Sequence, residues 1–427
     1  MDKILIKLEK ANGKAENPIE AKIHESNAFL LSLSPNILDL YLVGYSVFEV
    51  EKSLVFNRKI KKVTLPHVSE LDQQDKSQLC NLLKQLFLFL YKKKLHFSFK
   101  KIELTPQKET SSERRDYDKV MLFSGGLDST IGVNYCAAKN YNCQLVYIRH
   151  GNAGQLTPRI TQLEENLIKP KKMNLVRIVG PAQKSGYFAN TRGLLYLLTG
   201  AVFACQNKSP LIISECGVTM YQPRFGPLYG VTYTTHPAIL SLGKEIIKIF
   251  TKTDLEVILP FENNTKAEMV KKYGDATSIA SSFSCLRNLR FAVCKGNCGE
   301  CYACLVRRLG IIAAIDDPTT YSEKNSIGAI KNIKENLYPI INFCYRVITD
   351  FDGLEYWQKE RILKYDKKEL FYRFALDTFI ALEKISKKDK LPDWADRFLN
   401  GIDATLLQKR KDQLLQIKKY TSQQAGE

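Results

Sequence analysis

The sequence contains no long hydrophobic run and no apolar leader. Its longest strongly apolar stretch covers residues 194–205, well short of the roughly 20 residues that a transmembrane helix needs. The first ten residues, MDKILIKLEK, carry charges where a signal peptide requires an apolar core. We therefore predict a cytoplasmic protein with no membrane contact.

Internal repeats, low-complexity tracts and arginine-rich stripes with interleaved aromatic residues, a pattern of RNA-binding proteins, are also missing. Acidic residues are the scarcer charge, with 45 Asp and Glu against 63 Lys and Arg and a net charge of +18. The excess is mostly lysine spread along the chain, so it fits an anionic partner and a lysine-rich composition equally well. Nucleic acid stays open as a partner but is not favoured.

Strands alternate with helices in the centre of the 427-residue chain. The expected strands cover residues 120–123, 144–149, 175–179, 211–214 and 255–259, with helices at 129–138, 159–168 and 191–205. Strands separated by helices need crossover connections and so predict a parallel sheet. Ligands of such sheets bind beyond the carboxyl ends of the strands. We assign residues 119–318 to this α/β domain.

The flanking regions contain no chemical motif. We assign residues 1–105 to an N-terminal α+β appendage, with strands at 5–8, 28–33, 54–63 and 96–104 and helices at 39–51 and 76–91. Residues 106–118 contain charged residues and no aliphatic ones, and are predicted to be a linker. Residues 319–427 are predicted to be helical, with amphipathic helices at 327–347, 367–384 and 405–417.

A glycine-rich segment, residues 124–130 (SGGLDST), follows the first central strand and opens a helix. Two glycines let the backbone approach an anion closely, and free N–H groups at a helix start favour phosphate. The segment lacks the Gly-Lys-Ser/Thr ending of a Walker loop. Asp128 can hold Mg²⁺ against pyrophosphate. The residues expected to bind the phosphates are Ser124, Gly125, Gly126, Leu127, Ser129 and Thr130.

Cysteines cluster near the end of the central domain. Cys298, Cys301 and Cys304 are separated by two-residue gaps, and Cys285 lies upstream. In a cytosolic chain such a cluster indicates metal before disulfides, and four thiolates form a closed structural Zn²⁺ site. We predict Cys285 as the fourth ligand, with Cys294 as the alternative. An iron–sulfur cluster, a redox pair and free thiols are the other interpretations.

The glycine-rich segment resembles the PP-loop of the ATP pyrophosphatase superfamily, whose members split ATP between its α and β phosphates. Together with the cysteines, it resembles one branch, the QueC family of 7-cyano-7-deazaguanine synthases. That family joins an SGGxDS loop to a later Ser-Cys, matched by Ser284-Cys285, and to a CGxCxxC run followed by an arginine, matched by residues 298–304 and Arg307 or Arg308.

Two further segments carry the resemblance, which covers roughly residues 117–315. Residues 192–195 (RGLL) match an arginine-led helix start, and residues 265–268 (TKAE) match a Thr-Lys-x-Glu segment after a proline. The chain departs from the family at residues 150–152, where His-Gly-Asn replaces Tyr-Gly-Gln. Its appended regions, with residues 215–217 and 234–237, are similar to the longer QatC type of the family, found in anti-phage defence operons.

This resemblance implies a PP-loop fold and an AMP-forming carbon–nitrogen ligase that uses ATP and Mg²⁺. The carboxylate of 7-carboxy-7-deazaguanine would be adenylated and then coupled to an amine, which in the defence type is the N-terminus of a partner protein from the same operon. The alternatives are a 7-cyano-7-deazaguanine synthase that uses ammonia, a tRNA-modifying PP-loop enzyme, and a non-catalytic subunit that keeps the fold.

Catalytic roles are expected for Asp128, for Lys266 at the α-phosphate and for Arg192 at the nucleotide or the substrate carboxylate. Glu215 follows a strand end and could read the purine edge, and His150 could contact the substrate or act as a base, as could His236. The segment starting at Thr265 also has capping-box spacing, so that residue and the glutamate at 268 have a purely structural alternative.

Overall fold

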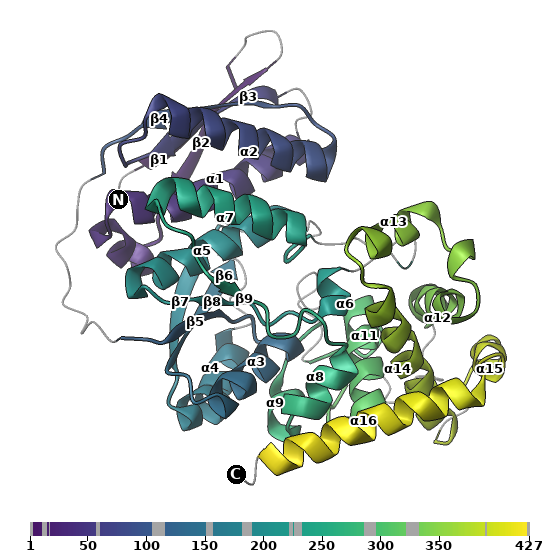
Figure 1. Ribbon diagram of the computed structural model, residues 1–427. Coiled ribbons are helices and arrows are strands. Elements are labelled where there is room, and N and C mark those ends of the chain that lie inside the picture. The colour runs from purple at the N-terminus through teal and green to yellow at the C-terminus, as the bar shows by residue number, and fades with distance from the viewer. Residues whose placement is uncertain are drawn as a thin grey trace.

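The computed structural model describes residues 3–10, 15–16, 18–56, 60–104, 116–150, 157–181, 190–221, 225, 233–285, 296–321, 333–388 and 391–424. They form a four-stranded sheet, a five-stranded sheet and a group of helices (Figure 1). The predicted linker falls mostly on residues 105–115, which lie outside the described part of the chain. No helix of the described residues is long and apolar enough to cross a membrane.

The first sheet has the order β2-β1-β3-β4. Its strands are β1 (Lys3–Lys10), β2 (Ile19–Lys22), β3 (Ile60–His67) and β4 (His96–Lys101). β1 is antiparallel to β2 and β3, whereas β3 and β4 are parallel and are joined through α2 (Gln73–Tyr91). The long helix α1 (Pro35–Phe56) precedes β3.

One strand prediction in this region is wrong, and another begins too early, since only residues 60–63 of the predicted strand 54–63 belong to β3. Residues 28–33 belong to a 3₁₀ helix, η1 (Glu25–Ser32), whose buried residues Asn27 and Leu30 are three apart, as one 3₁₀ turn requires. The segment predicted as a strand from residue 54 begins in α1, because Leu54 continues the buried face of Val47 and Val50 at helical spacing. Strand β2 was not predicted.

The second sheet is entirely parallel, which confirms the predicted α/β class with a parallel sheet. Its order is β7-β6-β5-β8-β9. The strands are β5 (Lys119–Leu122), β6 (Cys143–His150), β7 (Asn174–Gly180), β8 (Leu211–Ile212) and β9 (Val257–Ile258). In chain order, β6 and β7 are added on one side of β5, and β8 and β9 are then added on its other side. The strand order therefore reverses between β5 and β8, which is where open α/β sheets bind their ligands.

Helices bury both faces of this sheet. On one face lie α3 (Leu127–Ala138) and α4 (Thr157–Leu163), the latter continued by a π turn, η3 (Glu164–Ile168), and a 3₁₀ turn, η4 (Lys169–Lys171). On the other lie α5 (Arg192–Asn207) and α7 (Pro237–Thr251). Strand β5 alternates accordingly: Met121 packs in the core with α3 and α4, and Val120 in the core with α5.

The N-terminal region packs directly onto the second face, with α1 against α5 and α2 against α7 (Figure 1). The side chain of Asn27 pairs with the backbone of the edge strand β7. It donates to the Val179 carbonyl at 2.8 Å and accepts the Val179 N–H at 3.1 Å. Glu51 of α1 is completely buried and accepts the backbone N–H groups of Asn190 and Thr191, both at 2.7 Å, at the start of α5. One apolar core therefore runs from β1 to β8.

The remaining helices gather beside the carboxyl edge of the parallel sheet (Figure 1). Short helices α6 (Gly217–Met220), α8 (Lys266–Tyr273) and α9 (Ala276–Ser281) precede α11 (Tyr302–Ala314). The three predicted C-terminal helices correspond to α12 (Ile333–Thr349), α14 (Lys368–Ser386) and α16 (Ala404–Gln424). Two shorter helices, α13 (Tyr356–Lys364) and α15 (Asp393–Asn400), and a 3₁₀ turn, η6 (Phe351–Gly353), were not predicted.

We predict that Glu51→Ala lowers the free energy of unfolding by about 3 kcal/mol, because it leaves buried backbone donors at the start of α5 without an acceptor. Urea unfolding followed by circular dichroism measures the change. Glu165→Ala is the control. Its pair with Lys169 lies at 2.5 Å with both side chains more than half exposed, and its loss should cost no more than about 1 kcal/mol. Equal losses in the two variants would contradict the capping role of Glu51.

Candidate nucleotide site and metal centre

Chain segments from three parts of the sequence meet where the strand order reverses. Asp128 lies in the first turn of α3, just after β5, and is 8% exposed. Glu215 and Cys216 follow β8 and precede α6. Lys266 is the first residue of α8, which follows β9. The parallel topology thus brings two acidic residues and a lysine to one edge of the sheet.

Lys266 and Asp128 form a buried ion pair at this edge. The Lys266 Nζ lies 2.5 Å from Oδ1 and 2.7 Å from Oδ2 of Asp128, and each side chain is only 11% exposed. The Cys216 N–H donates to Oδ2 of the same carboxylate at 3.1 Å. The carboxyl group of Glu215 also hydrogen-bonds to Asp128. Two of the predicted catalytic residues, 138 positions apart, are therefore in direct contact.

The three ionisable side chains of this cluster shift one another's pKa values. Burial and the neighbouring Asp128 charge raise the pKa of Glu215 to about 8, so its carboxyl group is mostly protonated at neutral pH. Burial also opposes ionisation of Asp128, but the Lys266 ammonium outweighs it and lowers the pKa of that carboxyl. Likewise, burial opposes the charge of Lys266, and Asp128 outweighs it and raises the lysine pKa. The cluster thus holds one negative charge, one positive charge and one proton that can be released.

The glycine-rich segment forms a tight turn between β5 and α3. Gly125 has φ +76°, a conformation that favours glycine, and a Cβ there would lie 2.7 Å from the Cδ1 of Ile160 and displace that side chain. Gly126 occupies the N-cap and brings no side chain. The hydroxyls of Ser124 and Ser129 lie 3.2 Å apart, and the Ser129 hydroxyl also accepts the Ser124 N–H.

The cysteine segment is hydrogen-bonded to this turn. The Leu127 N–H donates to the Ser284 hydroxyl at 3.3 Å, and the Phe283 N–H donates to the Gly125 carbonyl at 2.8 Å. Asn297 fixes the segment from behind, because its side chain accepts the Ser284 N–H at 2.9 Å and donates to the Ser282 carbonyl at 3.0 Å. The residue before Cys285 and the residue before Cys298 therefore share one network with the turn.

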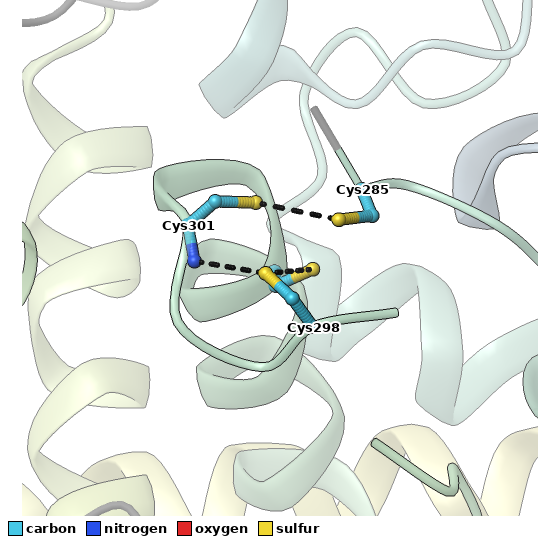
Figure 2. A group of neighbouring side chains, drawn as sticks. Cys285, Cys298 and Cys301 are labelled. Carbon is cyan, nitrogen blue, oxygen red and sulfur yellow. Dashed lines mark hydrogen bonds between the residues drawn. The ribbon is translucent and has the colours of Figure 1, made fainter. Parts of the chain in front are cut away.

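The four predicted metal ligands are buried and close together. Their sulfur atoms all lie within 4.8 Å of one another, with Cys298 and Cys304 at 3.9 Å and Cys285 and Cys301 at 4.0 Å. Figure 2 shows the side chains of Cys285, Cys298 and Cys301 turned toward a common centre. Tetrahedral Zn–S bonds of about 2.3 Å place the sulfurs about 3.8 Å apart. The group could hold a metal ion such as zinc.

Backbone donors complete this arrangement. The N–H groups of Glu300 and Cys301 point to the Cys298 sulfur at 3.5 and 3.3 Å, and Gly299 at φ +82° makes the turn possible. Such N–H···S bonds stabilise thiolate charge in the same way that N–H groups stabilise a carboxylate. The alternative ligand Cys294 lies outside the described residues.

Three other residues were predicted to contribute to the site: Arg192, Thr130 and His150. Arg192 begins α5, and its Nε is buried with no hydrogen-bond partner among the described residues. The Thr130 side chain is completely buried and donates to the Leu127 carbonyl at 2.8 Å, within its own helix. His150 ends β6, and its side chain lies outside the described part of the chain, as do Gly151 and Asn152.

The side chain of His236 caps a helix and packs among aromatic rings. Its Nδ1 accepts the Ala238 N–H at 3.1 Å, which caps α7, and the rings of Phe89, Tyr233 and Tyr365 surround it with centroids 5.2–5.5 Å away. Burial, followed by the charge of Arg361, lowers its pKa to about 3. A neutral, capping histidine in an aromatic cluster is not placed as a general base for neutral pH.

The capping-box interpretation of residues 265–268 is confirmed, and it coexists with the contact of Lys266. The Thr265 hydroxyl accepts the Glu268 N–H at 3.2 Å, and the Glu268 carboxylate accepts the Thr265 N–H at 2.9 Å. Asp377 of α14 and Arg410 of α16 also join this box. We did not predict these two residues or Glu51 from the sequence, because nothing local to them signals a partner more than 100 positions away.

No protein-family model matches this chain, and no curated protein does. The family assignment therefore stays a prediction that depends on the motifs and their placement.

We predict that the purified chain carries one zinc ion and that Cys298→Ser loses it. The variant should unfold at a clearly lower temperature, because metal-binding energy at such a site is folding energy. Elemental analysis and thermal unfolding measure both effects. Cys205→Ser is the control, since this half-buried thiol belongs to α5 and not to the cluster. A metal-free wild-type chain with unchanged stability after chelation would contradict the assignment.

Glu215 should make stability depend on pH in a defined window. Between about pH 5 and 8 the unfolded chain ionises this residue while the folded chain keeps its proton, so the free energy of unfolding should fall as pH rises. Glu215→Gln removes this contribution, and histidines and other acids cancel in the comparison. Urea unfolding of both proteins from pH 5.5 to 8.5 should show the wild type losing stability relative to the variant. Parallel curves would contradict the raised pKa.

Proposed function

We propose that the protein is a QueC-like PP-loop enzyme of the QatC type, which adenylates the carboxylate of 7-carboxy-7-deazaguanine with ATP and then forms an amide. The observation that carries the proposal is the contact of Lys266 with Asp128 at the strand-order reversal, beside a glycine turn that opens a helix. Nucleotide-binding α/β proteins use this position for phosphates.

In this proposal the turn from Ser124 to Ser129 binds the pyrophosphate part of ATP. Phosphate oxygens would accept the two serine hydroxyls and backbone N–H groups of the turn, in exchange for the hydroxyl partners that the N–H groups of Ser124 and Leu127 have in the described structure. Asp128 would hold Mg²⁺, because a carboxylate and phosphate oxygens are the ligands that this ion prefers. Glu215, protonated at neutral pH, would read the edge of the purine. When bound, the ion would offset the charge of the pyrophosphate.

Lys266 acts at the α-phosphate. In the described structure its ammonium is neutralised by Asp128, so a polyanion that enters the site competes for the lysine through its greater charge. Arg192, whose guanidinium lies over the ring of Tyr196, has a buried Nε with no hydrogen-bond partner among the described residues, and it would bind the nucleotide or the carboxylate of the substrate. Fixed cations of this kind stabilise charge that develops in the transition state.

The reaction has two steps. A carboxylate oxygen of the substrate attacks the α-phosphorus of ATP, and the bond from this phosphorus to the bridging oxygen of the β-phosphate breaks. Pyrophosphate departs with that oxygen, and the product is an acyl adenylate. An amine nitrogen then attacks the acyl carbon, AMP leaves with the bonding electrons, and the nitrogen loses a proton. The acceptor amine is the N-terminus of a partner protein in anti-phage defence, acting in the cytoplasm. With ammonia as acceptor, the same site would make the amide that precedes a nitrile.

We expect the protein, incubated with ATP, Mg²⁺ and 7-carboxy-7-deazaguanine, to release AMP and pyrophosphate, and to shift the mass of a protein encoded beside it. Asp128→Asn and Lys266→Met should each reduce AMP formation by on the order of 100-fold or more. Lys272→Met is the matched control. Lys272 lies on the same helix as Lys266, but its ammonium lies over the ring of Tyr273 and not beside Asp128. Mass spectrometry detects all products.

The outcomes separate the alternatives. A free nitrile formed with ammonium would indicate a synthase that carries extra regions. Binding of tRNA that weakens steeply with salt, without AMP formation from the deazaguanine, would indicate a tRNA-modifying enzyme. No AMP under any of these conditions would contradict the proposal.

A further inference from the structure

The C-terminal helix α16 reaches back to the start of α8, the helix that carries Lys266 (Figure 1). Arg410 of α16 is 2% exposed and is among the largest completely buried side chains of the described residues. Its Nη2 lies 2.5 Å from Oε1 of Glu268, and its Nε lies 3.2 Å from Oδ1 of Asp377. One guanidinium therefore joins two carboxylates from two other helices.

Both carboxylates act on the N-terminus of α8. Glu268 accepts the Thr265 N–H as part of the capping box, and Asp377 accepts the Thr265 hydroxyl at 2.6 Å. Burial opposes the charge of Glu268, but Arg410, followed by Arg373, outweighs it and keeps the pKa of that carboxyl low. Arg410 thus neutralises the acidic groups that fix the residue directly before Lys266.

The start of α8 at Lys266 is also in close contact with α11. A Cβ at Gly310 of α11 would lie 2.6 Å from the Lys266 Cβ, so the two helices meet at that glycine. Lys266 is therefore held between a close contact with α11 and the capping box supported by α14 and α16. Its side chain leaves this fixed point toward Asp128.

We propose that Arg410 is a positioning residue for Lys266, and that α16 belongs to the machinery of the nucleotide site although its described side chains contribute no group to it. The proposal rests on the function proposed above for Lys266. Displacement of the start of α8 moves the ammonium relative to the phosphates, and reacting groups are sensitive to displacements of about 1 Å.

The test compares Arg410→Met with Leu414→Ala in the full chain. Leu414 lies one turn further along α16 and is 5% exposed, so its truncation weakens the packing of the helix without touching Glu268. Hydrogen exchange followed by mass spectrometry reports on residues 262–273. Arg410→Met should speed the exchange of this segment, whereas Leu414→Ala should leave it close to wild type.

Steady-state AMP formation supplies the second readout. Arg410→Met should lower kcat by about 100-fold with little change in the KM for ATP, because Lys266 acts on charge that develops in the transition state. Leu414→Ala should keep kcat near wild type. Adding Asp377→Asn to Arg410→Met should restore part of both readouts, because the variant removes the carboxylate left without Arg410, and asparagine can still accept the Thr265 hydroxyl. Glu268 keeps its pair with Arg373 in both variants.

Equal effects of Arg410→Met and Leu414→Ala on exchange and kcat would overturn the proposal and leave α16 a packing element only. If Arg410→Met does not fold, Arg410→Lys takes its place, because a point charge cannot serve both carboxylates in the way a fork of donors does. If the wild type makes no AMP, the proposed function fails, while the exchange data still decide whether Arg410 orders the start of α8.

Discussion

The buried pair of Lys266 and Asp128 is the interaction on which the site depends. Each charge is expensive to bury alone, and each is tolerated because the other lies within hydrogen-bond distance. Asp128 is placed by the turn after β5, and Lys266 by the capping box of α8. A pair between residues 138 positions apart therefore requires the sheet, the glycine turn and the helical region to be assembled together.

Features with a local signal were predictable. The five central strands are short buried apolar runs between helices, and the SGGLDST turn and the CxxCxxC spacing each specify their geometry within a few residues. The strand order, and with it the contact of Asp128 and Lys266, was not visible in the sequence. Residues 28–33 were assigned wrongly because their apolar composition fits a strand, whereas in the fold they form the short helix that carries Asn27 to the edge of β7.

No functional role was predicted for either flanking region, and the physical reason is the same for both. Glu51 and Arg410 look like ordinary charged residues of amphipathic helices, yet each is buried against a helix that begins at a predicted site residue. Glu51 meets its backbone partner in the chain 139 positions later, and Arg410 meets Glu268 142 positions earlier. No pattern within one helix signals such a partner. The two ends of the chain thus hold the starts of α5 and α8 with opposite charges.

The distance from Glu268 to Arg410 along the chain has a consequence for the order of events during synthesis. The glycine turn, Asp128 and Lys266 leave the ribosome long before Arg410, since synthesis proceeds at about 5–20 residues per second. Until α16 arrives, Glu268 and Asp377 carry acidic groups that lack the guanidinium which later joins them. A nascent chain that already contains the phosphate-binding turn would consequently reach its final arrangement only when its last described helix docks.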